Sequence, residues 1–250
     1  MNQLVSIITP TYNASKYIMD VYHSLECQTH TNWEWIITDD CSTDGTLDII
    51  EELSRQDSRL KIYKNNCNSG AAVSRNNSLS QAVGEFIAFI DSDDIWLPEK
   101  LEKQIRFMGK DISFSFTGYK IISEDGSDLC QTVDTFHTEP LDYNDMLKKK
   151  ATLGCSTVML RQGVIDDLSM PLLRTGQDYA LWLKILKKGI KAHALTEVLT
   201  QYRIVAGSIS RNKIKKSQRQ WEIYRKVERL SFIHSTWCFA FYAWRAVFRR

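Results

Sequence analysis

The sequence lacks the segments that mark membrane-spanning and secreted proteins. No apolar run reaches the roughly 20 residues that a helix needs to cross a bilayer. The N-terminal stretch MNQLVSIITPTYN has neither a basic segment nor a long apolar core, so it is not typical of a signal peptide. None of the six cysteines forms a C-x-x-C pair, and no histidine has zinc-finger spacing, which predicts free thiols in a reducing cytoplasm.

Two glycine-rich phosphate-binding fingerprints are also missing. Neither G-x-G-x-x-G nor G-x-x-x-x-G-K-[ST] follows any strand that the sequence predicts. If the chain binds a nucleotide, the phosphate charge must therefore be neutralised by something other than a glycine loop, such as a divalent cation. The sequence contains no internal repeat and no low-complexity segment.

The charge of the chain is unevenly distributed. Of the 250 residues, 43% are hydrophobic and 25% are charged, an ordinary balance for a globular protein of about one to two domains. Residues 201–250 contain 12 lysines and arginines against 2 acids, so a tail of net charge +10 follows a body of net charge −8. Such asymmetry indicates an anionic partner for the tail, either a membrane or a nucleic acid.

The first 94 residues alternate strand patterns with helical ones. Between the strands, apolar side chains recur at helical spacing. This order predicts an α/β fold with a Rossmann-like, mostly parallel sheet and helices on both faces. Apolar and β-branched runs place the predicted strands at residues 4–9, 33–38, 60–64 and 85–90.

Beyond Pro98 this alternation changes. Further strands, some of them antiparallel, are expected within residues 111–122 and 154–160, and a helix is expected over residues 177–189. The predicted organisation is a first half (1–94) and a second half (95–205) of one domain (1–205), then a basic, aromatic, helical tail (206–250).

Polar side chains follow three of the predicted parallel strands, and the last group is acidic. The carboxyl ends of parallel strands share one edge of a sheet, where ligands bind. Neighbouring carboxylates repel one another, and a divalent cation would remove the repulsion. Hard carboxylate oxygens suit Mg²⁺ or Mn²⁺. The residues expected to meet at this edge are Thr9, Tyr12, Asp39, Asp40, Asp91 and Asp93.

Five motifs in order resemble one family of enzymes. They are VSIITPTYNA (5–14), IITDDCSTDGT (36–46), NSGAAVSRNNSL (68–79), FIDSDDIW (89–96) and QDYALW (177–182). Together they are similar to the family 2 inverting glycosyltransferases of GT-A fold, of the bacterial surface-polysaccharide type, over about the first 205 residues. The resemblance implies transfer of a sugar from a nucleotide-diphosphate sugar to a hydroxyl of a glycan or lipid-linked saccharide, by a metal-assisted single displacement. The first half would bind the nucleotide and the second half the acceptor.

The resemblance also implies roles for the matching residues. Asp178 would be the general base. Asp93 would be the direct ligand of Mn²⁺ or Mg²⁺, with Asp91 beside it on ribose or metal-bound water. A carboxylate at Asp39 would accept a hydrogen bond from N3–H of uracil or thymine, which cytosine lacks, so a UDP or dTDP donor is favoured. The remaining donor contacts would be Thr9, Tyr12, Asp40, Arg75 and Ser92.

Two positions depart from the usual family pattern. Relatives often carry a histidine shortly after a Tyr-Arg pair, where it can join the metal, whereas QYRIVAGSIS has Val205 in that region. Either the metal then relies on Asp93, phosphate and water, or Arg203 or Arg211 neutralises part of the diphosphate charge. Gln177 also replaces the more usual glutamate before Asp178, and the helix dipole would weaken Asp178 as a base unless burial offsets it.

Other readings of the same residues remain open at the level of sequence. The acids could be helix caps or turn residues, although Asp94 alone would suffice to cap a helix near Pro98. Arg75 could be a charged residue on the solvated face of a helix. The tail could pack on the domain or on a second subunit, but we favour an anionic membrane contacted through residues 211–250, which would place the chain at the inner face of the cytoplasmic membrane.

Two other functions compete with sugar transfer. They are a metal-dependent phosphotransferase and a nucleic-acid-binding protein that uses the basic tail. The acidic body and the absence of a recognised reading motif argue against a nucleic-acid partner. A phosphotransferase would leave the motifs TPTYN and DDCSTDG unexplained.

Overall fold

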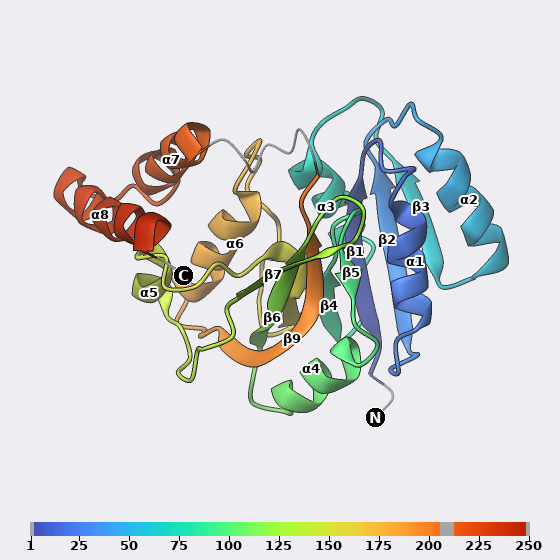
Figure 1. Cartoon of the computed structure of the whole chain (residues 1–250), viewed down its shortest axis with the longest axis horizontal. Coiled ribbons are helices and arrows are strands. Elements are labelled where there is room, and N and C mark those ends of the chain that lie inside the picture. Colours follow the sequence, from blue (N-terminus) through green and yellow to red (C-terminus); the bar gives the residue numbers. More distant parts are fainter. Residues whose placement is uncertain (1–2, 206–212, 249–250) are drawn as a thin grey trace.

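The computed structural model describes residues 3–205 and 213–248 (Figure 1). Its strands are β1 (Val5–Thr11), β2 (Trp33–Asp39), β3 (Leu60–Lys64), β4 (Phe86–Phe89), β5 (Ile95–Trp96), β6 (Phe114–Ile122), β7 (Asp128–Val133), β8 (Val158–Arg161) and β9 (His193–Arg203). Its helical segments are α1 (Ile18–Glu26), α2 (Thr46–Gln56), α3 (Ala71–Leu79), α4 (Lys100–Met108), α5 (Tyr143–Leu147), η1 (Cys155–Thr157), α6 (Gln177–Leu186), α7 (Lys213–Glu222), η3 (Ile223–Val227) and α8 (Phe232–Phe248).

Four parallel strands form the half of the sheet that the sequence predicts best. Their order is β3-β2-β1-β4, and each pairing among them is parallel. Successive side chains of a strand point to opposite faces, so Ile7 shares a hydrophobic cluster with α1, α2 and α4, while Ile8 shares one with α3 and α6. Helices therefore cover both faces of the sheet, which confirms the predicted arrangement.

The second half extends the same sheet with antiparallel pairs. β8 pairs antiparallel with β4, β6 pairs antiparallel with β8, and β9 then runs parallel to β6. β5 and β7 pair antiparallel with β9 and β6, respectively. In the described residues the sheet is thus mixed, and its uniformly parallel part is limited to the first four strands of the chain.

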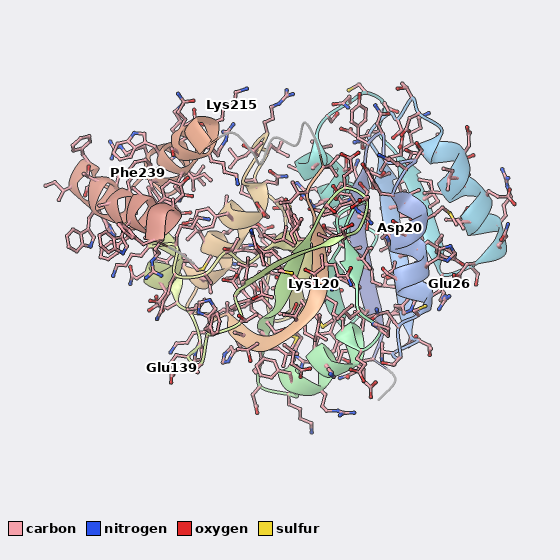
Figure 2. The ribbon with its side chains drawn as sticks, in the orientation of Figure 1. Asp20, Glu26, Lys120, Glu139, Lys215 and Phe239 are labelled. Carbon is pink, nitrogen blue, oxygen red and sulfur yellow. The ribbon has the colours of Figure 1, made fainter. Side chains whose placement is uncertain are left out.

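The C-terminal helices pack against the second half of the domain (Figures 1 and 2). Ile223 and Tyr224 are buried in the hydrophobic cluster that includes α5 and α6. The Tyr224 hydroxyl donates to the carbonyl of Leu147, and the Tyr143 hydroxyl donates to Glu228 Oε2 at 2.6 Å. Over residues 3–205 and 213–248, no helix is both long enough and apolar enough to cross a bilayer.

Lys100 is a buried base without an acidic partner among the described residues. Its Nζ donates to Gln104 Oε1 at 2.7 Å and lies 4.1 Å from the centre of the Trp96 ring. Burial lowers the pKa of Lys100 to about 7. The ammonium form is therefore disfavoured in the folded protein.

We expect Lys100 to make stability depend on pH above neutrality. Lysine in an unfolded chain has a pKa of about 10.4, so between about pH 7 and 10 the unfolded state binds the extra proton and stability rises with pH. Relative to Lys100→Met, the free energy of unfolding of the wild type should rise by about 1.4 kcal/mol per pH unit in this window. Urea titration of both proteins at several pH values measures the free energy of unfolding. If it changed with pH in parallel for the two proteins, Lys100 would be charged in the folded state.

Candidate active site

The acidic loop after β4 lies at the carboxyl edge of the sheet. β4 is buried throughout, and the Ile90 amide still donates to a carbonyl of β1 at 3.1 Å before the chain leaves the sheet. The Asp94 amide then donates to the Asp91 carbonyl at 3.2 Å, which closes a turn. On this turn Asp91, Ser92 and Asp93 are partly exposed, whereas Asp94 is fully buried.

The carboxylates of this loop disfavour one another's charged forms. Burial, and then the charge of Asp91, raise the pKa of Asp93 to about 6. Burial, and then the charges of Asp93 and Asp91, raise the pKa of Asp94 well above its usual range. A divalent cation would favour the ionised form of Asp93, and the oxygen ligands fit Mn²⁺ or Mg²⁺. In the described part of the chain no three metal-ligating side chains are grouped, so phosphate or water would have to complete the shell.

Arg75 on α3 places a buried guanidinium beside the acidic loop. It is only 5% exposed and forms an ion pair with Asp91. Burial acts to lower the pKa of Arg75, but the neighbouring Cys155, Asp91 and Asp178 together raise it. Its Nε and Nη1 have no hydrogen-bond partner among the residues described. Two buried, unpaired donors of a cation form a suitable contact for an anionic ligand oxygen.

Asp39 and Asp40 follow each other at the end of β2 but have different partners. Asp39 is fully buried; its Oδ2 accepts from the Ser42 amide at 2.9 Å, and its Oδ1 has no partner within the described ranges. Asp40 accepts from the amides of Ser69 and Gly70 at 2.8 and 2.7 Å. Both oxygens of Asp40 therefore fix the loop that precedes α3, and the predicted contact of Asp40 with the donor stays a prediction.

Thr9 and Tyr12 lie in contrasting environments. Thr9 is fully buried, and its hydroxyl donates to the Ile90 carbonyl at 2.9 Å and accepts from Trp35 Nε1 at 2.8 Å. Its side chain joins β1 to the end of β4, and its predicted contact with the nucleoside stays a prediction. Tyr12 is 51% exposed just beyond β1, where its ring is accessible to a planar base.

Arg203 at the end of β9 holds the acidic loop in place. Its amide donates to Asp94 Oδ1 at 2.9 Å, and its Nε donates to the Asp93 carbonyl at 2.9 Å. Its two terminal nitrogens donate to the Glu124 carbonyl and to an acid of α1. This buried guanidinium bonds within the protein, and the predicted contact of Arg203 with the diphosphate stays a prediction. Arg211, the other predicted contact, lies outside the described residues.

Asp178 enters the site from the N-terminus of α6. The helix begins after Gly176, whose φ of 71° lies in the left-handed region that glycine adopts without steric cost. Asp178 is partly exposed in the first turn, and its charge acts on Arg75. The fold therefore brings together Asp178, Arg75 and Asp91 from three elements that are distant in the sequence.

Ser156 in η1 belongs to the site although nothing in the sequence signals it. Its hydroxyl accepts from the Asp91 amide at 3.0 Å and donates to Asp94 Oδ2 at 2.5 Å. Asp94 does not cap the following helix, because α4 begins at Lys100 and has no side-chain cap. Asp94 and Ser156 instead position the backbone of the acidic loop, and the motif FIDSDDIW was the available signal for Asp94.

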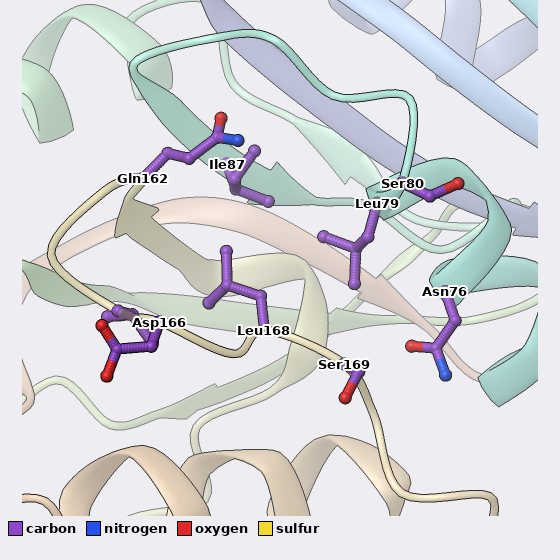
Figure 3. A pocket seen from close by; sticks show the side chains of 9 residues that line it. Asn76, Leu79, Ser80, Ile87, Gln162, Asp166, Leu168 and Ser169 are labelled. Carbon is purple, nitrogen blue, oxygen red and sulfur yellow. The ribbon is translucent and has the colours of Figure 1, made fainter.

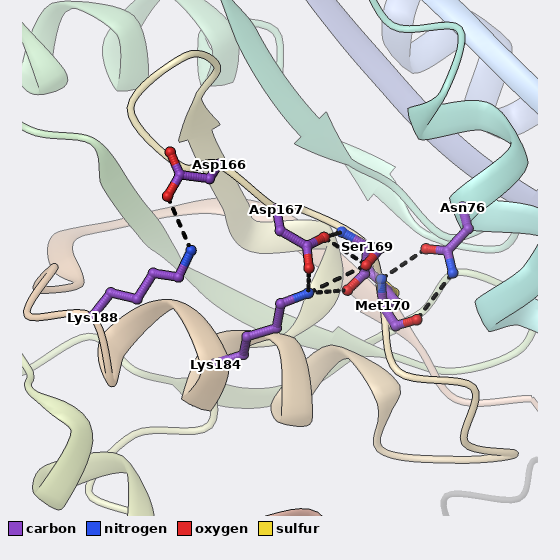
Figure 4. A network of polar contacts seen from close by, with 7 residues as sticks. All are labelled: Asn76, Asp166, Asp167, Ser169, Met170, Lys184 and Lys188. Atoms are coloured by element: carbon purple, nitrogen blue, oxygen red, sulfur yellow. Dashed lines mark hydrogen bonds and ion pairs between the residues drawn. The ribbon is translucent and has the colours of Figure 1, made fainter.

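Polar contacts clamp α3 to the segment that precedes α6 (Figure 4). Asn76 donates to the Met170 carbonyl at 3.0 Å and accepts from the Met170 amide at 2.7 Å. Lys184 of α6 forms an ion pair with Asp167 at 2.5 Å. Because Asn76 is adjacent to Arg75 on α3, this clamp fixes Arg75 relative to α6 and its N-terminal acid.

The pocket in Figure 3 lies beside this clamp and not in the acidic cluster. It has a volume of about 290 Å³ and is lined by α3, β4 and the segment 162–169. None of the residues predicted for catalysis, donor binding or metal binding lines it. We therefore assign this pocket no part in the candidate site.

Comparison with solved structures defines the class of protein. The fold matches residues 1–349 of TarS from Staphylococcus aureus in complex with UDP-GlcNAc, with a TM-score of 0.75 and 25% identity over 98% of this chain and 73% of that one. It also matches the mannosyltransferase PcManGT from Pyrobaculum calidifontis in complex with GDP-Man and Mn²⁺, with a TM-score of 0.71 and 16% identity over 99% of this chain and 76% of that one. The fold is that of the GT-A glycosyltransferases.

The chain belongs to glycosyl transferase family 2, whose model matches residues 6–168. It is 48% identical over 248 residues to the "Putative teichuronic acid biosynthesis glycosyltransferase TuaG" of Bacillus subtilis, covering 99% of this chain and 97% of that protein. It is 41% identical over 243 residues to the Escherichia coli "UDP-Glc:alpha-D-GlcNAc-diphosphoundecaprenol beta-1,3-glucosyltransferase WfaP", covering 96% and 93%, respectively. The protein is therefore a glycosyltransferase, which confirms what the sequence motifs imply.

Proposed function

We propose that this glycosyltransferase moves a sugar from a UDP-type donor, or a dTDP-type one, to a hydroxyl of a lipid-linked saccharide. The observation that carries the proposal is the meeting of an unpaired Asp39 oxygen, the unpaired donors of Arg75 and the acidic loop at one edge of the sheet. The relatives support it, because the name of WfaP specifies a UDP-Glc donor and a diphosphoundecaprenol-linked acceptor. Family membership favours sugar transfer over the alternative of a phosphotransferase.

The donor is recognised at both ends of its nucleotide. Asp39 Oδ1 accepts from N3–H of uracil or thymine, since a buried acceptor without a partner is costly unless a ligand supplies the donor. The exposed ring of Tyr12 stacks on the base. Nε and Nη1 of Arg75 bind oxygens of the diphosphate or sugar, and Ser92 lies beside them on the acidic loop.

Asp93, with Asp91 beside it, is the group that would hold Mn²⁺ or Mg²⁺. When bound, the cation would act as a Lewis acid that neutralises charge on the departing diphosphate. Arg75 holds Asp91 by an ion pair and adds a second positive charge at the same place. The amide of Asp91 donates to the Ser156 hydroxyl, which orients the loop.

Transfer proceeds by one displacement with inversion. Asp178 takes the proton of the acceptor hydroxyl while the hydroxyl oxygen attacks the anomeric carbon. The new carbon–oxygen bond forms as the bond from that carbon to the diphosphate oxygen breaks, and the electron pair leaves with the nucleoside diphosphate. Asp178 lies in the first turn of α6, where its side chain presents the oxygen that would take this proton.

The proposed acceptor implies work at a membrane surface. A saccharide attached to a lipid stays at the surface that holds the lipid, so the enzyme has to reach it there. Residues 201–250 have a net charge of +10, which favours binding to the anionic inner face of the cytoplasmic membrane. We place the protein there as a peripheral enzyme.

Replacing Asp39 by asparagine tests base recognition. The amide can donate but no longer presents two acceptor oxygens, so UDP affinity should fall by about 1–3 kcal/mol, or roughly 5- to 150-fold. CDP affinity should fall less or rise, because cytosine N3 is an acceptor. Calorimetric titration of both nucleotides measures the ratio, with Asp48→Asn, an exposed acid of α2, as the control. An unchanged preference for UDP would remove Asp39 from the base site.

A further inference from the structure

Helix α8 is apolar on two opposite faces. At 3.6 residues per turn, residues 235, 238, 239 and 242 gather on one side of the helix, and residues 233, 237, 244 and 248 gather on the other within an arc of roughly 60°. The helix contains no acidic residue and a single arginine. A surface helix of a monomer normally has one apolar face, so the second face requires an explanation.

The inner face of α8 is the one that docks on the protein. Ser235 and Cys238 are fully buried, and Cys238 belongs to the hydrophobic cluster of α5 and α6. The ring of Phe239 packs edge-on against Trp221 of α7, with centroids 5.6 Å apart. Lys187, directly after α6, also forms an ion pair with Glu228, which lies just before α8, at 3.0 Å. The orientation of the helix is therefore fixed by its inner face.

The outer face presents large apolar side chains to solvent. Ile233 is 82% exposed, Trp237 59%, Trp244 61% and Phe248 59%. Five of the eleven large hydrophobic side chains that are exposed in the described residues belong to α8, the fifth being Phe232. Figures 1 and 2 show that α8 lies at the periphery, with side chains projecting away from the rest of the molecule. A contiguous apolar stripe of this kind marks an interaction surface.

The basic residues of the tail distinguish between the two kinds of partner. Arg225, Lys226 and Arg229 are exposed in and next to η3, directly before α8, and residues 201–250 have a net charge of +10. Two copies of the chain that met through their stripes would bring two such tails together and repel each other. An anionic lipid surface instead attracts the basic residues and accepts tryptophan and phenylalanine at the level of its headgroups.

We propose that the outer stripe of α8 (Ile233, Trp237, Trp244 and Phe248) is the face that inserts into an anionic membrane interface. The helix lies in the plane of the membrane, while its inner face holds the catalytic domain against it. The role of this contact rests on the proposed lipid-linked acceptor, but the binding itself needs only the stripe and the basic residues.

Vesicle co-sedimentation of the full chain tests the assignment. The probes are phosphatidylcholine vesicles with and without about 30% phosphatidylglycerol. Wild type should bind the anionic vesicles, and Trp237→Ser/Trp244→Ser should bind at least about tenfold more weakly. The matched control is Phe136→Ser/Leu172→Ser, which removes two side chains that are 84% and 73% exposed far from α8 in the sequence and should not change binding.

Every outcome decides the proposal. Equal binding by the two double variants, or no binding by wild type, would overturn it. A stripe-dependent dimer in light scattering, without vesicle binding, would overturn it in favour of contact between copies. UDP binding is measured on the same variants and should be unchanged. Because UDP binding and vesicle binding are separate measurements, an absence of UDP binding would contradict the proposed donor site but not the membrane contact.

Discussion

Replacing Asp178 by asparagine should reduce sugar transfer by about 10²- to 10⁴-fold while UDP still binds. The amide keeps the size of the side chain at the N-terminus of α6, but it cannot take a proton, and general-base catalysis contributes about this factor. Turnover with a nucleotide sugar and an acceptor, and UDP affinity by calorimetry, are measured on the same preparation.

The control for this prediction comes from the segment that precedes α6. Asp166→Asn removes an acid that forms an exposed ion pair with Lys188 at 3.3 Å, and turnover should stay normal. Normal turnover by Asp178→Asn would remove that residue from the mechanism. If turnover and UDP affinity fell together, Asp178 would belong to the donor site.

Asp93→Ala should weaken Mn²⁺-dependent UDP binding by at least about 100-fold, because the variant loses the charge that would hold the cation. The fold should be as stable as the wild type or more stable, since burial and Asp91 disfavour the ionised form of Asp93 and raise its pKa to about 6. Calorimetry with Mn²⁺ and with EDTA measures the first effect, and thermal unfolding without ligand measures the second.

Asp111→Ala is the matched variant, since it removes an exposed acid that lies outside the acidic loop. It should bind UDP with the same dependence on Mn²⁺ as the wild type. If Asp93→Ala also retained that dependence, the cation would be held by other residues, and the role proposed for the acidic loop would be withdrawn.

The sequence predicts those elements whose side chains are buried on both faces. β4 is buried along its whole length and β2 likewise, so their apolar runs are unbroken and easy to place. β7 is almost entirely exposed and β9 is mostly half-buried, so neither shows the alternation or the apolar run that identifies a strand. These two strands form because they pair with β6, and the local sequence pattern does not reveal such a tertiary contact.

The sequence predicts which types of residue form the candidate site, but it does not predict which hydrogen-bond partners each residue has. Acidic residues that directly follow an apolar strand indicate the edge of the sheet where a ligand binds. The structure brings Asp91, Arg75 and Asp178 together at this edge. Asp39 and Asp40 are adjacent and chemically identical. Only the tertiary contacts show that Asp39 has an unpaired acceptor oxygen, whereas Asp40 fixes a loop. The same limit applies to buried side chains predicted as ligand contacts, because sequence does not reveal which hydrogen bonds are already made.

A crystal structure of the protein with UDP and Mn²⁺ tests the central claim most directly. The account predicts uracil N3 within hydrogen-bond distance of Asp39 Oδ1, the diphosphate beside Arg75, and the cation between the diphosphate and Asp93. A nucleotide bound in the pocket between α3 and the segment 162–169, or anywhere else with the acidic loop empty, would contradict it.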